Sequence, residues 1–219
     1  MTNLEKAIEK IEKARLAYDK KHIVKIVAAS KYVDSEAIKE LYGEGQRAFG
    51  ENKAQDMKEK SSQLSDLPIE WHYLGRIQTN KINMILDINP YLIHSINDYE
   101  TAIEIDKRAK AKNIKINGLL QINSAKEESK AGVFPEVGCE EYIKITENLS
   151  NINLKGVMTI GAHTDDLRVV SDSFAACRKI FDSLKNYNPT ICSMGMSSDY
   201  ELAIANGSTM VRIGSAIFK

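Results

Sequence analysis

The stretch IVKIVAA at residues 23–29, followed directly by Ser30-Lys31-Tyr32, distinguishes between two folds that the pattern of this chain allows. Its branched, apolar residues are typical of a buried parallel strand. An open doubly wound sheet normally has a glycine-rich turn after its first strand. The turn at 30–32 contains no glycine. We therefore expect a closed barrel, with the open sheet as the alternative.

The rest of the chain alternates between short apolar runs and amphipathic helical patterns. After 23–29, the expected strands are 47–50, 69–75, 91–96, 114–123, 154–161, 190–195 and 209–214. Eight strands separated by helices can close into a (β/α)8, or TIM, barrel, for which about 250 residues are typical. The α/β fold that we predict is a single TIM-barrel domain over residues 1–219.

An extra helix is expected before the first strand. Thr2 and Glu5 have the spacing of a capping box, in which the two residues satisfy each other's free backbone N–H groups. Leu4, Ile8, Ile11 and Tyr18 should then form its apolar face. A later helix has the clearest apolar stripe in the chain, formed by Leu167, Val170, Phe174, Cys177, Phe181 and Leu184.

Composition excludes several classes of function. The 219 residues carry a formal net charge of zero, which favours neither nucleic acid nor an anionic membrane as a partner. The charged N-terminus has no apolar core of a signal peptide, and no apolar run approaches the 18 residues that would suggest a membrane span. Cys139, Cys177 and Cys192 are far apart and odd in number, which indicates structural thiols in a reducing cytoplasm.

Metal and hydrolase chemistry have little support in the sequence. The four histidines show no i,i+4 spacing, and no two cysteines are close enough to form a typical metal motif. The G-x-S-x-G motif of a serine hydrolase is absent. His72 and His94 lie on apolar strands, so we expect them to be hydrogen-bonded core residues.

The active face of a TIM barrel lies at the carboxyl ends of its strands. Lys31 follows the first strand directly, and Glu51 and Asn52 follow the second. A lysine at the edge of a barrel interior is costly to bury, and partial desolvation lowers its pKa so that it can form an imine with an aldehyde. The alternative is an exposed lysine that merely follows a strand.

Two loops near the end of the chain suggest a phosphate site. The loops after strands 7 and 8 commonly bind phosphate in such barrels. Here they read GMSS at 195–198 and IGSA at 213–216, rich in small residues with hydroxyls and free backbone N–H groups. Ser197 precedes a helix that should start near Asp199, and helix N-termini favour phosphate. Ser197 or Ser198 could equally be the cap of that helix.

Six segments carry a resemblance to a known family. They are IVAASK (26–31), GENKAQD (50–56), WHYLGRIQTNK (71–81), INSAKEESKAG (122–132), GVMTIG (156–161) and MGMSSDYELAIANGSTMVRIGSAIFK (194–219). Together they resemble the pyridoxal phosphate homeostasis protein family, which is similar to the N-terminal barrel of alanine racemase, in PLP fold type III. The match runs from about residue 24 to residue 218, and its last segment is highly specific.

The resemblance implies that the cofactor is pyridoxal 5'-phosphate (PLP), bound as a Schiff base to Lys31. It also implies that Arg212 faces the pyridine nitrogen, that Asn52 lies near the ring or its 3'-oxygen, and that Ser197, Gly214 and Ser215 hold the phosphate. The sequence departs from the family at three positions, where Lys53, Ser215 and Lys219 replace residues that are usually aromatic, threonine and glycine.

Two classes of function remain open. One is a PLP carrier that buffers the cofactor and supplies it to apo-enzymes; the other is an amino-acid racemase or a related PLP enzyme. Racemases use a second base from a further domain, which the sequence after strand 8 does not provide, and an arginine at the ring nitrogen weakens the electron sink. We therefore expect a monomeric carrier without catalytic residues. A barrel that has lost PLP is a third reading, which Lys31 and Arg212 disfavour.

Overall fold

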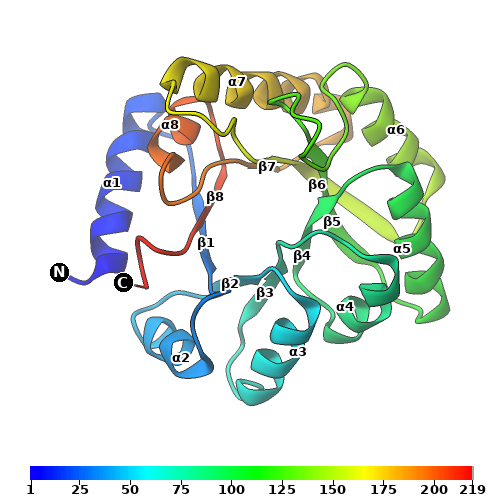
Figure 1. The fold of residues 1–219 in the computed structure, drawn as a ribbon, viewed down its shortest axis with the longest axis horizontal. Coiled ribbons are helices and arrows are strands. Elements are labelled where there is room, and N and C mark those ends of the chain that lie inside the picture. The colour runs from blue at the N-terminus through cyan, green and yellow to red at the C-terminus, as the bar shows by residue number, and fades with distance from the viewer. Residues whose placement is uncertain (219) are drawn as a thin grey trace.

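A computed structural model describes residues 1–218, in which eight parallel strands form one closed barrel (Figure 1). The strands are β1 (Lys25–Ala29), β2 (Ala48–Glu51), β3 (Glu70–Tyr73), β4 (Leu92–Ile96), β5 (Ile116–Ile122), β6 (Ile152–Thr159), β7 (Ile191–Ser193) and β8 (Met210–Ile213). They follow one another around the barrel in chain order, and β8 pairs with β1 to close it. The predicted barrel is confirmed, and the open sheet was the wrong alternative.

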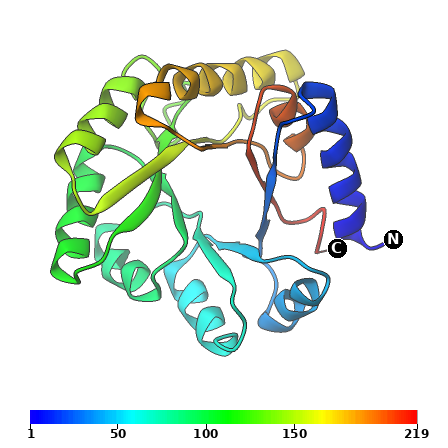
Figure 2. The same ribbon diagram turned by 180° about the vertical axis from the view of Figure 1, so that it is seen from behind.

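Helices surround the barrel on its outside, as Figures 1 and 2 show from opposite directions. They are α1 (Asn3–Tyr18), α2 (Ser35–Gly43), α3 (Ala54–Gln63), α4 (Ile82–Ile88), α5 (Tyr99–Ala111), α6 (Gly138–Asn148), α7 (Leu167–Ser183) and α8 (Tyr200–Ala205), with short 3-10 turns at Thr79–Lys81 and Lys185–Tyr187. The extra helix α1 lies beside α8, which places both chain ends on the same side of the molecule.

The start of α1 is as predicted, but its apolar face is not. Both hydrogen bonds of the Thr2–Glu5 capping box are present. The buried stripe runs through Leu4, Ala7 and Ile11, whereas Ile8 and Tyr18 are each 42% exposed. The small Ala7 allows close packing, so the contact face is rotated away from Ile8.

The stripe on α7 is confirmed with two exceptions. Val170, Phe174, Cys177 and Leu184 are buried, and Phe181 packs against the core while partly exposed. Leu167 is exposed, because it is the first residue of the helix and lies beyond the sheet that the other residues cover.

The core has two layers because side chains on a strand alternate between the barrel interior and the helices. An inner cluster fills the barrel, and a larger outer cluster lies between strands and helices. The inner residues are Val27, Ala48, Leu92, Leu119, Met158 and Met210. Arg212 pairs with Val27 across the β1–β8 seam and follows Met210 by two residues, so its side chain also points inward.

The cysteines are free thiols, as predicted, with Cys177 and Cys192 buried and Cys139 partly exposed. His72 and His94 are fully buried and hydrogen-bonded to each other, which confirms that they are core residues. No helix within residues 1–218 is long and apolar enough to cross a membrane.

Candidate functional site

A cavity of about 510 Å³ lies at the carboxyl ends of β1, β7 and β8. Five of the six residues singled out from the sequence line it. They are Lys31, Ser197, Arg212, Gly214 and Ser215. They come from three strand ends far apart in the sequence, and the parallel order β7–β8–β1 brings them together.

Lys31 stands at the rim of this cavity. It follows β1 in a turn closed by the Val33 N–H, which donates to the Ser30 carbonyl at 3.1 Å. The Lys31 side chain is exposed, and its Nζ lies 4.8 Å from the centroid of the Tyr32 ring. The partial burial that we expected from its position is therefore not present. The amine is instead accessible both to the cavity and to solvent.

A buried ion pair supports the residue before Lys31. Glu51, at the end of β2, is fully buried, and its Oε1 accepts from Ser30 Oγ at 2.6 Å and from Lys60 Nζ at 2.7 Å. Lys60 Nζ also donates to the Ser30 carbonyl at 2.9 Å. Sequence reasoning found Glu51 at a strand end but missed Lys60, because no motif marks an ion pair between a strand and the helix after it.

Arg212 forms part of the inner wall. It is 6% exposed, and its Nη1 donates to Ser193 Oγ at 2.6 Å while its Nη2 donates to the Thr159 carbonyl at 2.9 Å. Burial lowers the pKa of Arg212 to about 10, although the Asp199 carboxylate acts in the opposite direction. The guanidinium therefore stays cationic at neutral pH and is held from two sides.

The two small-residue loops meet at Ser197 and Gly214. Ser197 Oγ accepts a hydrogen bond from the Gly214 N–H at 3.1 Å. A Cβ at Gly214 would lie 2.9 Å from the Ala29 carbonyl oxygen, so this loop runs close against β1. Within residues 1–218, the backbone N–H groups of 197, 198, 215 and 216 donate to no protein acceptor. Ser197, Ser198 and Ser215 line the cavity, and unpaired N–H groups and hydroxyls beside one cavity suit an anion.

The helix after Ser197 differs from our expectation. The N-cap of α8 is Asp199, and its Oδ1 accepts from the Met196 N–H at 2.6 Å. Neither Ser197 nor Ser198 is the cap, so that alternative was wrong. Because α8 has only six residues, the case for an anion here depends on the loops rather than on a helix dipole.

Asn52 is the one predicted residue outside the cavity wall. It follows β2 on the same end of the barrel and is exposed. A Cβ at Gly75 would lie 1.7 Å from the Asn52 carbonyl oxygen, so only glycine allows the two loops to approach this closely. Lys53 is also exposed at this rim, whereas Lys219 lies outside the described residues.

Apolar residues complete the cavity wall, and sequence reasoning did not identify them. Tyr32, Val33, Met196 and Phe218 line it together with Ala29 and Ser198. Tyr32 is 87% exposed, which is unusual for a large aromatic residue. Its position directly after Lys31 was the available signal.

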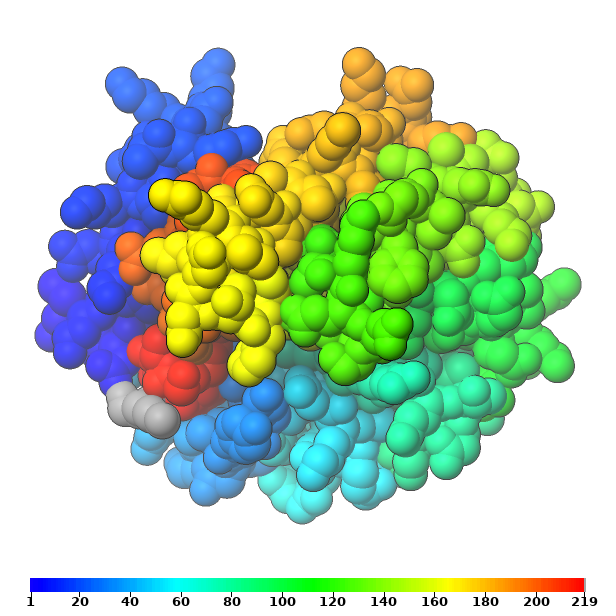
Figure 3. Space-filling model, turned by 45° about the horizontal axis from the view of Figure 1, so that its top comes forward, coloured from blue at the N-terminus to red at the C-terminus, as the bar shows by residue number. Residues whose placement is uncertain are grey.

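A second hollow of about 700 Å³ adjoins the cavity and shares Met196 and Ser198 with it. Figure 3 shows the loops after β5 and β6 side by side on this face, in green and yellow. Lys130 Nζ donates to the Gly161 carbonyl at 2.8 Å, and the His163 N–H donates to Glu127 Oε1 at 3.1 Å. These contacts tie the two loops together at the mouth of the barrel.

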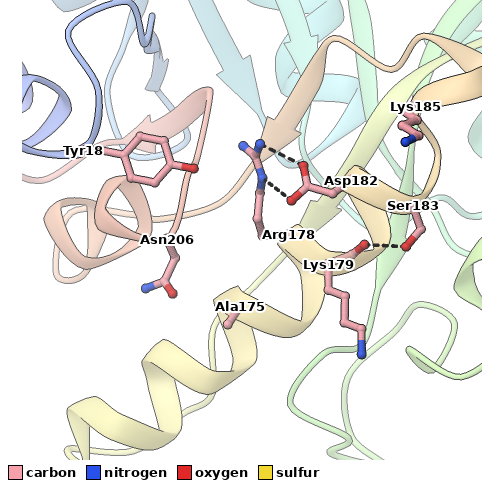
Figure 4. Close-up of a pocket in the computed structure, with 8 residues that line it drawn as sticks. All are labelled: Tyr18, Ala175, Arg178, Lys179, Asp182, Ser183, Lys185 and Asn206. Atoms are coloured by element: carbon pink, nitrogen blue, oxygen red, sulfur yellow. Dashed lines mark hydrogen bonds and ion pairs between the residues drawn. The ribbon is translucent and has the colours of Figure 1, made fainter.

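A third cavity, of about 520 Å³, lies on the outer surface beside α7 and is shown in Figure 4. Its Arg178 is paired with Asp182 at 2.8 Å and donates to the Gly207 carbonyl at 2.7 Å. Because this cavity lies away from the strand ends, it does not contribute to the site. Within residues 1–218, no three His, Cys, Asp or Glu side chains are grouped as metal ligands would be.

Comparison with known proteins fits this geometry. Residues 3–219 match the family described as alanine racemase, N-terminal domain. The pyridoxal phosphate homeostasis protein of Helicobacter pylori is 52% identical over 212 residues, which cover 97% of this chain and 95% of that protein. The chain belongs to the pyridoxal phosphate homeostasis protein family.

Solved structures show the same fold as this member of the pyridoxal phosphate homeostasis protein family. The structure of PipY from Synechococcus elongatus with PLP bound has a TM-score of 0.81 and 30% identity, covering 95% of this chain and all of that one. Alanine racemase from Clostridium difficile shares the fold, with a TM-score of 0.77 and 18% identity. The match covers 98% of this chain and 56% of the racemase.

Proposed function

We propose that this chain binds PLP in the cavity at the carboxyl ends of β1, β7 and β8, and that it buffers and supplies this cofactor within the cell. The observation that carries the proposal is that an accessible amine, a fixed guanidinium and two loops with serine hydroxyls and unpaired N–H groups line one cavity. Its volume lies within the usual range for small-molecule sites. The related PipY structure with PLP bound supports the same reading, with residues 1–219 acting as one PLP-binding domain.

Each lining residue has a role in this proposal. Lys31 Nζ supplies the amine for a Schiff base, and the hydroxyls of Ser197 and Ser215 donate to the phosphate beside the N–H groups near Gly214. Arg212 donates to the pyridine nitrogen. Asn52 reaches the 3'-oxygen only if its side chain turns inward from the rim. When bound, PLP supplies an electrophilic aldehyde and an electron-withdrawing ring.

A carrier fits these residues better than a racemase. A cationic Arg212 beside the ring nitrogen opposes its protonation, which weakens the ring as an electron sink. Racemisation also requires an acid–base group on each face of the substrate carbon. The titratable groups among the described lining residues are Lys31, Tyr32 and Arg212, and the Tyr32 ring lies 4.8 Å from Lys31 Nζ. Because Tyr32 is beside Lys31 and Arg212 stays cationic, the described lining supports one base and no second base opposite it.

The proposal also covers the cellular location and the oligomeric state of the carrier. Three free cysteines support a reducing cytoplasmic location. We propose that the protein acts as a monomer and passes PLP to apo-enzymes. Light scattering of the purified protein tests the first point, since a monomer has a mass of 24.5 kDa.

The test of PLP binding uses the purified protein and its Lys31→Ala variant. The wild-type protein should become yellow with PLP, and borohydride should fix the cofactor on Lys31, as read by peptide mass spectrometry. The loaded protein should also reactivate a PLP-requiring apo-enzyme. The Lys31→Ala variant should form no fixed adduct and should retain less PLP than the wild-type protein. Absence of binding, or an adduct on another residue such as Lys81, would contradict the proposal.

A further inference from the structure

A row of buried polar side chains crosses the barrel interior below the cavity. Arg212 Nη1 lies 2.6 Å from Ser193 Oγ, which lies 3.3 Å from His94 Nδ1. His94 Nε2 lies 2.9 Å from His72 Nδ1. Ser193, His94 and His72 are fully buried and come from β7, β4 and β3. The row thus crosses the barrel interior among the apolar residues of the inner cluster.

The row ends at the opposite side of the barrel. His72 Nε2 lies 4.0 Å from Glu70 Oε2, which is longer than a hydrogen bond, so Glu70 acts on His72 as a charge. Glu70 is itself ion-paired with Lys25 at the start of β1. His72 and Lys25 lower the pKa of Glu70 to about 2, against the effect of its partial burial.

The charges at the two ends of the row favour one direction for its hydrogen bonds. A guanidinium has donors and no acceptor, so Ser193 Oγ must accept from Arg212. The hydroxyl proton of Ser193 can then be donated to His94 Nδ1, and His94 can donate from Nε2 to His72 Nδ1, which leaves the proton of His72 on Nε2, facing Glu70. The reverse order would direct the lone pair of His72 Nε2 at the Glu70 carboxylate, which is unfavourable. In the favoured order both imidazoles are neutral and in the Nε2–H tautomer.

Burial and charge keep the histidines neutral. Burial lowers the pKa of His94 well below its usual value, and nearby His72 and Arg212 act in the same direction. Burial also lowers the pKa of His72, although Glu70 opposes this effect. Protonation of either histidine would add a second positive charge near Arg212 and is therefore disfavoured. The direction of the hydrogen bonds is maintained.

We propose that Ser193, His94 and His72 are positioning residues that hold Arg212 as a hydrogen-bond donor toward the pyridine nitrogen of PLP. This inference rests on the proposed function, since it assigns a role toward bound PLP. Arg212 carries five N–H groups on a flexible side chain, and a fixed acceptor at Nη1 restricts which of them faces the cavity. Without Ser193, the guanidinium keeps only the Thr159 carbonyl as a fixed acceptor, so its orientation is less restricted.

The test compares two ligands in two serine variants. The ligands are PLP and an analogue that has a carbon in place of the ring nitrogen. In Ser193→Ala we expect PLP affinity to fall about tenfold, because a hydrogen bond to a charged group is misplaced, while affinity for the analogue is unchanged. Ser208→Ala is the matched control, since Ser208 is equally buried beside β7 and β8 and bonds only backbone groups.

The outcomes separate this inference from the proposed function. If wild-type protein does not bind PLP, the proposed function fails. If it binds PLP but Ser193→Ala weakens both ligands equally, or weakens neither, the positioning role is refuted and PLP binding stands.

A second measurement needs no variant and no ligand. Ring ¹⁵N chemical shifts of the histidines in the wild-type protein at neutral pH should show both His72 and His94 as neutral Nε2–H tautomers. A proton on Nδ1 of His94 would contradict the proposed direction of the hydrogen bonds, and this result can be obtained even if Ser193→Ala fails to fold.

Discussion

Lys60 Nζ lies 2.7 Å from Glu51 Oε1, and this carboxylate is fully buried at the end of β2. The same ammonium donates to the carbonyl of Ser30, the residue before Lys31. The pair therefore joins helix α3, strand β2 and the turn that presents the amine. Removing one member leaves the other charge buried without its partner, which is the costly case for a buried ion pair.

We expect Lys60→Met to lower the free energy of unfolding by about 3–5 kcal/mol, because Glu51 would remain buried without a cation. Urea unfolding at neutral pH measures this loss. Lys58→Met is the control, since Lys58 is an exposed residue of the same helix, and its change should stay within about 0.5 kcal/mol. Equal effects of the two substitutions would show that the ion pair contributes nothing specific.

Replacing Ser197 and Ser215 by alanine should weaken PLP binding more than pyridoxal binding. Both serines line the cavity, and each charge-assisted hydrogen bond to a phosphate contributes about 1.5–3 kcal/mol. Pyridoxal has no phosphate, so it controls for general damage to the cavity. Titration of each variant with both ligands gives the comparison, and similar losses for the two would mean that these serines do not contact the phosphate.

The stability of the protein should fall as the pH drops below about 6.5. The pKa values of His72 and His94 are lower in the folded state than in the unfolded chain, so the unfolded chain binds more protons in this range. The maximal slope is about 1.4 kcal/mol per pH unit for each histidine. Glu70, with a pKa of about 2, contributes stability that is lost only at lower pH, below its ordinary value of 4.5.

Urea unfolding between pH 7.5 and pH 5 measures this dependence. His94→Gln should remove about half of the slope, whereas His163→Gln, at an exposed position, should leave it unchanged. A free energy of unfolding that is flat across this range would contradict the burial of neutral histidines.

The PLP-loaded protein should not turn over amino acids at the rate of an enzyme. Incubation with L-alanine in D2O should give slow deuterium incorporation at Cα and little D-alanine, because the proposed site lacks an acid–base group opposite Lys31, and such help is worth about 10²–10⁴-fold. Chiral chromatography and mass spectrometry follow both products. Turnover near the ~1 s⁻¹ lower end of typical kcat values would restore the racemase alternative.

The alternation of strands and helices was sufficient to predict the barrel, and strand ends were sufficient to predict that Lys31, Ser197 and Arg212 lie at the same end of it. These predictions depend on local pattern and on the parallel topology, both of which can be read along the chain. The contact of Lys60 with Glu51 could not be predicted, because it depends on how α3 packs against β2. The same limit applies to Ile8, since the rotation of α1 is set by the surface that it covers.

The sequence also could not predict how side chains are oriented at the rim of the cavity. Asn52 was expected beside the ring, and it is exposed at the end of β2 and does not line the cavity. A serine cap for α8 was the alternative left open by the sequence, while Asp199 occupies that position. Each of these loops contains several polar residues, and the geometry of the loop determines which of them takes the predicted position.

The seam between β1 and β8 has a consequence for synthesis of the protein. Val27 pairs with Arg212 across it, so Lys31 and Arg212 come together only when the first and last strands join. A chain emerging from the ribosome N-terminus first cannot assemble this site until β8 has been made. A ligand that bridges the seam binds the closed ring and not the open one, and therefore shifts the equilibrium toward the finished barrel.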